Sequence, residues 1–335
     1  MEVPRPSQLR DHPEAGEAVY TRSVTGSVPD EYAALRGGAA LVGLPGTILR
    51  LSGGKAGELL NSVLTNQVPE RGNLGVYALL LNPKGRIQTD LRVLKATGGD
   101  VLIAVEPEGA TAAKELLGRY APFYRTGLED LSEGDAPWGI LGLYGPGARN
   151  LLDGPELAEH ETADVKAGGA GLLAAGVALP VPGYDLLGPA DALDAAREHL
   201  VGRGAVPVGL GAYETARVEA CVPRFGSDIT PENFPAEAGV LDRAVSFEKG
   251  CYPGQETVAR MRYRGHPNKT LHRFAVEGAA PPGAGILQSG KPVGTVTSVA
   301  PLPVNGEVLA LGYLSRNADA QGELRAGDAT LRPLA

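Results

Sequence analysis

Residues 249–256 read Lys249-Gly250-Cys251-Tyr252-Pro253-Gly254-Gln255-Glu256, and the interpretation of the whole chain starts from this stretch. It combines an ammonium, a thiol, an amide and a carboxylate within eight positions. Its two glycines permit backbone geometry that a side chain would forbid, and they allow a ligand to approach closely. Its proline suits the first turn of a helix. A segment that serves packing alone is mostly apolar, so this polar segment indicates a functional site.

Cys251 is the clearest candidate for chemistry within this stretch. Lys249 and the N-terminus of the following helix would favour its thiolate form, which is the reactive one. Such a thiol could attack an electrophile, take up a one-carbon unit or contact a metal cluster in transit. The alternative is a small residue packed beside a tight turn. Lys249 itself could bind an anion or tune the thiol, or it could be a solvated charge.

The composition excludes several classes of protein. The chain has 335 residues, with 31 Lys and Arg against 39 Asp and Glu, giving a net charge of −8. This balance argues against direct nucleic-acid binding, which needs a basic surface. No apolar run reaches the roughly 18 residues of a membrane span, and the first 20 residues lack the apolar core of a secretory signal. We therefore expect a cytoplasmic protein without membrane partners.

Cysteine and histidine usage gives no sign of a bound metal. Cys221 and Cys251 are the only cysteines, and the chain has five histidines. Two cysteines form neither a disulfide framework nor a complete four-ligand zinc site. We therefore expect no metal site.

Hydrophobic periodicity predicts a mixed α+β fold rather than a doubly wound parallel sheet. Residues 76–81 and 86–94 are predicted to form a hairpin, because Asn82-Pro83-Lys84-Gly85 between them are turn residues. In the second strand of this hairpin, buried positions alternate with polar ones, which include Asp90 and Arg92. Further strands are predicted at 47–51, 101–105 and 138–144, and helices at 29–36, 55–64, 108–120, 191–201, 212–220 and 253–264.

The same patterns divide the chain into three parts. Residues 1–28 are expected to be loosely ordered, and residues 29–265 to form an α+β region of two lobes. Residues 266–335 are expected to form a small antiparallel β-barrel, with strands near 271–276, 294–299 and 308–313.

The opening stretch resembles the K-G-C-Y-x-G-Q-E signature of the YgfZ-type folate-binding proteins. These proteins belong to the superfamily of the glycine-cleavage aminomethyltransferase, or T-protein. Shorter pieces resemble other motifs of the superfamily in the expected order: Leu64-Thr65-Asn66-Gln67, Asn82-Pro83-Lys84-Gly85-Arg86, Arg217-Val218-Glu219-Ala220 and Gly294-Thr295-Val296-Thr297-Ser298. The resemblance runs from about residue 30 to 315, and only the octapeptide is specific by itself.

The resemblance implies a three-lobed ring around a central folate pocket, and tetrahydrofolate or a derivative as the cofactor. Within the R-x-E motif, it implies that Glu219 hydrogen-bonds the pterin, since a carboxylate can accept two adjacent N–H groups of an aminopyrimidine. The Cys251 thiol is expected to face this pocket. The other residues expected at the cofactor are Arg217, Tyr252, Gln255 and Arg260.

Several of these residues have a simpler alternative role. Glu219 could pair with a neighbour on an exposed helix face. Gln255 and Glu256 could instead satisfy backbone N–H groups in the first turn of a helix. Arg260 belongs to a basic cluster that could hold the glutamate tail of folate, touch RNA or form a solvated face, and its other members are Arg262, Arg264, His266, Lys269, His272 and Arg273.

The resemblance implies a tetrahydrofolate-binding accessory protein that supports the assembly, repair or activity of iron–sulfur enzymes, including those that modify tRNA. Its partners would be such enzymes or cluster carriers. The alternative is a folate-dependent one-carbon transferase of the aminomethyltransferase type. A third possibility is an assembly partner that has lost folate, which would show a blocked pocket or a solvent-facing Glu219.

Two departures from the T-protein pattern favour the accessory function. The T-protein has a pair of acids after its glycine turn, whereas this chain has Thr89-Asp90 and so lacks one of them. The T-protein also lacks the octapeptide signature. Asp90 remains a candidate general base, although an acid on the polar face of a strand is more often simply exposed.

Overall fold

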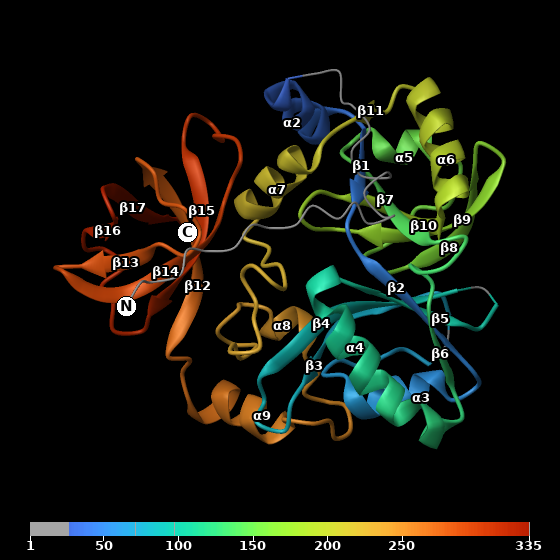
Figure 1. The fold of residues 1–335 in the computed structure, drawn as a ribbon, viewed down its shortest axis with the longest axis horizontal. Coiled ribbons are helices and arrows are strands. Elements are labelled where there is room, and N and C mark those ends of the chain that lie inside the picture. Colours follow the sequence, from blue (N-terminus) through green and yellow to red (C-terminus); the bar gives the residue numbers. More distant parts are fainter. Residues whose placement is uncertain (1–26, 71, 97, 335) are drawn as a thin grey trace, which may run out of the picture.

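The computed structural model describes residues 27–70, 72–96 and 98–334, and it contains two open β-sheets and one closed barrel (Figure 1). This confirms the predicted α+β class and its C-terminal antiparallel barrel. The expected loose order of residues 1–28 falls almost entirely outside the described residues. Within those ranges, no helix is both long and apolar enough to cross a membrane.

The first sheet has six strands, and helix α6 (Ala190–Gly202) packs on it through Leu193, Ala196 and Leu200. Helix α2 (Val28–Gly37) precedes its first strand, and α5 (Ala148–Leu151) follows its central one. The strand order is β11 (Val206–Pro207), β1 (Ala40–Leu44), β7 (Trp138–Tyr144), β10 (Gly183–Pro189), β9 (Ala170–Val177) and β8 (Thr162–Ala167).

The second sheet is inserted between β1 and β7 and has five strands. Their order is β3 (Val76–Leu81), β4 (Ile87–Lys95), β5 (Val101–Val105), β2 (Thr47–Ser52) and β6 (Gly127–Asp130). Helices α3 (Ala56–Val63) and α4 (Pro107–Tyr120) and the 3₁₀-helix η1 (Ala121–Tyr124) follow strands of this lobe. The predicted hairpin of β3 and β4 is present.

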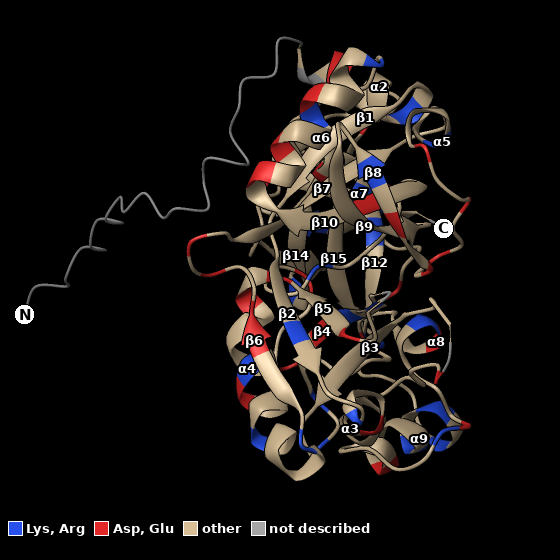
Figure 2. Cartoon of the chain, turned by 90° about the vertical axis from the view of Figure 1, so that its right-hand side faces the viewer, with Lys and Arg blue, Asp and Glu red and all other residues tan. Residues whose placement is uncertain are grey.

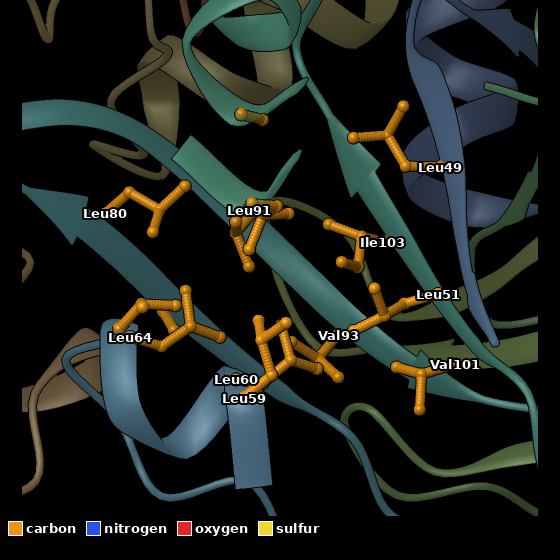
Figure 3. Close-up of a cluster of buried hydrophobic side chains, with 14 of the residues drawn as sticks. Leu49, Leu51, Leu59, Leu60, Leu64, Leu80, Leu91, Val93, Val101 and Ile103 are labelled. Atoms are coloured by element: carbon orange, nitrogen blue, oxygen red, sulfur yellow. The ribbon is translucent and has the colours of Figure 1, made fainter. Parts of the chain in front are cut away.

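The alternation in β4 decides which face of the second sheet is buried. Leu91 and Val93 lie in the core with Leu59 and Leu60 of α3 and with Ile103 of β5 (Figure 3). Side chains of a strand alternate between its two faces, so the polar residues of β4 lie on the other side. That polar side forms one wall of the central pocket described below.

The barrel closes through antiparallel pairing in the order β12 (Lys269–Glu277), β15 (Val308–Ser315), β14 (Lys291–Val299), β13 (Gly285–Gln288), β16 (Leu324–Ala326) and β17 (Ala329–Leu334). Phe274 is fully buried at its centre. The sequence located β12, β14 and β15 but not the other three, which are shorter. The domain boundaries themselves stay predictions.

Helix α7 (Leu210–Glu219) connects the open sheets to the barrel through a buried ion pair. The Arg217 guanidinium donates to Asp228 at 2.6 Å, and their side chains are 4% and 0% exposed. Ser298 and Thr297 of β14 donate to the other carboxylate oxygen of Asp228, at 2.8 and 2.5 Å. Arg217 also donates to Glu214 and to Ser298. The R-x-E and G-x-V-T-S motifs are therefore linked through one aspartate.

Asp228→Ala is expected to lower the free energy of unfolding by about 3–5 kcal/mol, because it leaves the Arg217 charge buried without its partner. The measurement is urea denaturation followed by far-UV circular dichroism. The control is Glu323→Ala, which removes one partner of the exposed Arg325–Glu323 pair and should change stability by less than about 1 kcal/mol. Equal losses in the two variants would contradict the prediction.

Candidate functional site

The central pocket is a cavity of about 180 Å³ between the two open sheets, closed on one side by α7. Strands β3, β4 and β5 supply one wall, and β7, β9 and β10 supply another. Its polar lining consists of Tyr77, Asp90, Arg92, Glu106, Tyr144, Glu159, His160, Asp185, Tyr213, Glu214, Arg217, Arg224 and Arg243. A cavity with this many charged groups indicates a ligand-binding or catalytic site.

Asp90 is an acid of β4 that faces this pocket. It is 8% exposed, and the Tyr77 hydroxyl donates to its Oδ2 at 2.8 Å. Burial raises the pKa of Asp90 to about 6, although the hydrogen bond from Tyr77 acts in the opposite direction. A carboxyl group with a pKa near neutrality can both accept and give up a proton at physiological pH.

Thr89 occupies the position at which the T-protein resemblance led us to expect a second acid. Its side chain is fully buried on the other face of β4, where a Cβ on Gly109 of α4 would collide with it. Its hydroxyl donates to the Asp90 carbonyl at 2.9 Å. An acid at position 89 would therefore face α4 and not the pocket, so its absence does not remove the acid of the pocket.

Glu106 also lines the pocket, and the sequence analysis did not select it. It lies between β5 and α4, directly before Pro107. Burial and, after it, the negative charge of Asp90 raise the pKa of Glu106 to about 8, while Arg224 opposes the shift. In the sequence, the one sign that Glu106 belongs to the site was its position as an acid at the end of a buried strand.

Arg92 and Asp185 form an ion pair across the pocket, and so connect β4 of one sheet to β10 of the other. The Tyr144 hydroxyl also donates to Asp185, and the Tyr144 ring stacks on Tyr213 of α7 with ring centroids 5.6 Å apart. This network spans both lobes and α7, so it fixes the distance between the pocket walls.

Three nitrogen atoms of lining residues are buried without a partner among the residues that the structure describes. They are Arg92 Nε, His160 Nδ1 and Arg224 Nε. Burial and the charge of Arg92 lower the pKa of His160 to about 4, so its ring is neutral at pH 7. Buried polar atoms usually have partners, so these three indicate a ligand that supplies hydrogen bonds.

Glu219 is not in the pocket, contrary to expectation. Its carboxylate accepts the Tyr32 hydroxyl at 2.5 Å and lies 3.7 Å from an Arg36 nitrogen, both on α2. Tyr213 and Arg217 line the pocket, and successive helical residues are about 100° apart, so the residue two positions beyond Arg217 lies on another side. Arg217 does line the pocket, but its hydrogen bonds go to Asp228, Glu214 and Ser298.

The octapeptide lies outside the pocket as well, against the β3–β4 turn. Lys249 donates to the Asn61 and Leu64 carbonyls at the end of α3, at 2.8 and 2.5 Å. Gly254 has a φ of 83°, and a Cβ there would lie 2.8 Å from the Cα of Gly85. Gly254 therefore serves the close approach of two backbones, whereas a Cβ on Gly250 would meet nothing within 4 Å.

Cys251 is exposed on this outer loop and does not face the central pocket. The thiol is therefore not in this pocket, and its contact with a folate stays a prediction. The Lys249 ammonium is directed at the carbonyls of α3, so its hydrogen bonds do not go to the thiol. Tyr252 is 6% exposed and packs in a hydrophobic core with residues such as Leu79 and Phe225.

Gln255 and Arg260 belong to helix α9 (Gln255–Arg264), which carries basic and acidic residues at the periphery of the molecule (Figure 2). Arg260 is exposed, and neither residue lines the central pocket. Arg262 pairs with the exposed Asp242, which follows the start of α8 (Leu241–Ala244). The basic cluster therefore does not gather around the pocket, and the structure offers it no contact with a ligand there.

Comparisons with known proteins identify relatives of this chain and of its fold. A family model described as the GCVT N-terminal domain matches residues 5–170. An aminomethyltransferase of Streptomyces avermitilis is 30% identical over 90% of this chain and 85% of its own. One of Thermus thermophilus is 32% identical over 77% and 75%. The glycine cleavage system aminomethyltransferase T of Bartonella henselae has a similar fold, with a TM-score of 0.78 at 21% identity, covering 92% of this chain and 88% of that one.

Asp90→Asn is expected to stabilise the protein above pH 6. The fold raises the pKa of Asp90 from 3.8 to about 6, so the folded protein favours the protonated carboxyl. The contribution of this preference to the stability of the protein is lost as the pH rises from about 4 to about 6. Asparagine is neutral throughout, so at pH 8 the variant should be more stable by on the order of 2 kcal/mol, and near pH 4 by little.

The measurement is urea denaturation at several pH values, and the matched control is Asp242→Asn, whose side chain is 87% exposed. The control should show no comparable pH-dependent gain. If Asp90→Asn were less stable than the wild type at pH 8, the prediction would be wrong, because other groups would then compensate the buried charge of Asp90.

Proposed function

This chain belongs to the aminomethyltransferase family, and from that we propose that it is a folate-dependent one-carbon transferase. Its substrates would be a reduced folate and an aminomethyl group attached to a carrier. The observation that carries the proposal is Asp90, a buried carboxyl of the central pocket whose pKa lies near 6. General acid–base catalysis needs a group of this kind.

The residues of the pocket fit a reduced folate. The aminopyrimidine edge of a folate offers N–H donors and acceptor atoms side by side, and the pocket lining offers groups of both kinds. Arg92, His160 and Arg224 contribute the buried nitrogens that lack a partner in the described chain. The Tyr213 ring, which stacks on the buried Tyr144 ring, offers a flat surface for a bicyclic ring system. When bound, the folate would supply the nucleophilic nitrogens that accept the one-carbon unit.

Within this site Asp90 would hold or accept the proton of the reacting nitrogen. Tyr77 fixes the orientation of its carboxylate through the 2.8 Å hydrogen bond. Burial raises the pKa of the Tyr77 hydroxyl well above its usual value, so this group remains a donor. The buried walls limit access of water, which strengthens the electrostatic interactions of the site.

The test is transfer of a one-carbon unit to tetrahydrofolate by wild type and by Asp90→Asn. The variant should lose about 10²- to 10⁴-fold in rate, which is the usual contribution of a general acid or base. Its affinity for tetrahydrofolate, measured by calorimetry, should change by far less. Ala104→Phe, which fills the pocket from β5, should abolish binding, with a circular dichroism spectrum to confirm that it is folded.

The calorimetric measurement and the transfer assay test folate binding and the chemical step separately. Binding by wild type without any transfer would reject the transferase and leave a folate-binding protein. Unchanged binding by a folded Ala104→Phe variant would place the folate elsewhere. Glu219→Gln is the matched control for binding, because its carboxylate lies outside the pocket and its loss should leave the affinity unchanged within about twofold.

A second candidate function is the YgfZ-type accessory role, in which the protein supports iron–sulfur enzymes, including tRNA-modifying ones, in a tetrahydrofolate-dependent way. One observation favours it: the octapeptide holds Cys251 exposed at the periphery, where the pocket chemistry does not use it. An exposed thiol there could contact an iron–sulfur enzyme or a cluster carrier. A cytoplasmic location, predicted from the sequence, would suit such partners.

Cys251→Ser is expected to abolish this support while folate binding stays unchanged. The measurement is the cluster content and activity of an iron–sulfur enzyme in cells that produce either the wild type or the variant as their only copy. Cys221→Ser is the matched control, since Cys221 is half-buried and lies at the end of α7. Full support by the Cys251 variant would exclude the thiol from the accessory role.

A further inference from the structure

Two acids on neighbouring segments line the central pocket, Asp90 on β4 and Glu106 directly beyond the end of β5. Strands β4 and β5 are antiparallel, and their pairing ends with Arg92 opposite Ala104. Asp90 lies two residues before Arg92, and Glu106 lies two residues after Ala104. All four residues line the cavity. Because neighbouring strands of a sheet lie about 4.8 Å apart, we infer that the two carboxyl groups lie near each other.

The surroundings of the two acids are not equivalent. Asp90 receives the Tyr77 hydroxyl at 2.8 Å, which stabilises its ionised form. Glu106 makes no side-chain hydrogen bond within residues 27–70, 72–96 and 98–334, so nothing comparable stabilises its anion. Two neighbouring buried carboxyls do not both ionise readily, and the one without a donor keeps the proton. The pKa values of about 6 for Asp90 and about 8 for Glu106 agree with this order.

Most of the other charges around Glu106 also favour its protonated form. Acids approach it from three elements, whereas one arginine opposes them: Asp90 on β4, Glu108 on α4, Glu214 on α7, and Arg224 after α7. Arg224 donates to Glu214 at 3.0 Å, so its charge is partly compensated. Burial raises the pKa values of the neighbouring Tyr77 and Tyr213 hydroxyls, and the charge of Glu106 adds to both shifts, so these hydroxyls stay neutral.

We propose that Asp90 and Glu106 hold one proton between them at neutral pH, and that Glu106 is the proton donor of the central pocket while Asp90 is its ionised acceptor. The shared proton depends only on the geometry of the free protein. The chemical role of the pair rests on the proposed one-carbon transfer.

In that transfer, a carrier–X–CH₂–NH₂ group, where X is the attaching heteroatom, reacts with two N–H groups of the folate. Two new C–N bonds form on the carbon, and its bonds to X and to the amine nitrogen break. Asp90 takes one N–H proton, and Glu106 gives its proton to the departing amine, which leaves as ammonia with the bonding electron pair. The other N–H proton ends on X. Transfer of a proton from Asp90 to Glu106 then restores the pair.

The experiment is a pH titration of the free protein with ¹³C-labelled carboxyl groups, observed by NMR. Wild type should show steps near pH 6 and pH 8 that belong to the pair. Glu106→Gln should remove the upper step and leave the lower one in place, because Glu106 is still neutral when Asp90 titrates. Asp90→Asn should remove the lower step and shift the Glu106 step to lower pH, because it removes the opposing charge.

Either of two results would overturn the shared proton: Glu106 titrating in the ordinary acidic range in wild type, or a Glu106 step that does not move in Asp90→Asn. In the transfer assay, Glu106→Gln should lose about 10²-fold or more in rate and lose the decline of rate above pH 8. Glu108→Gln is the matched control, since it removes a nearby charge that does not line the pocket, and its rate should stay close to wild type. If the titration is as expected but the wild type transfers no one-carbon unit, the transferase proposal is rejected and the shared proton of Asp90 and Glu106 stands.

Discussion

The buried ion pair between Arg217 and Asp228 holds the pocket wall against the barrel. Charges removed from water are stable only when their hydrogen bonds are complete, and here hydroxyl groups of β14 complete those of Asp228. Because Arg217 lies on the same helix as Tyr213 and Glu214, the barrel fixes where these two residues stand in the pocket. In the described chain, no barrel strand lines the pocket, so the barrel acts on the site through α7.

Charged groups of the pocket fall into two kinds: one kind holds the pocket walls together, and the other is suited to proton transfer. The Arg92–Asp185 pair joins the two open sheets, so its charges balance each other and set the spacing of the walls. Asp90 and Glu106 lack a cation of their own, and burial raises their pKa values into the neutral range. Such groups destabilise the ionised protein, and sites that do so are commonly the functional ones.

The octapeptide shows that reactive residue types do not by themselves locate a pocket. Its Gly254 allows the backbone to approach the β3–β4 turn, and Lys249 completes the hydrogen bonding at the end of α3. The same residue types would serve a catalytic loop, so the sequence could not separate the two roles. The exposed position of Cys251 is what keeps a second, peripheral function open.

Periodicity among neighbouring residues was enough to predict the α+β class, the β3–β4 hairpin, the main helices and the polar face of β4 that carries Asp90. The contact of Glu219 with α2, and the position of Glu106 in the same pocket as Asp90, are visible only in the folded structure. The face of a helix that meets a cavity, and the register between two strands, depend on segments far apart in the chain. Local patterns carry no information about such long-range pairing, so the identity of the pocket acids was settled by packing.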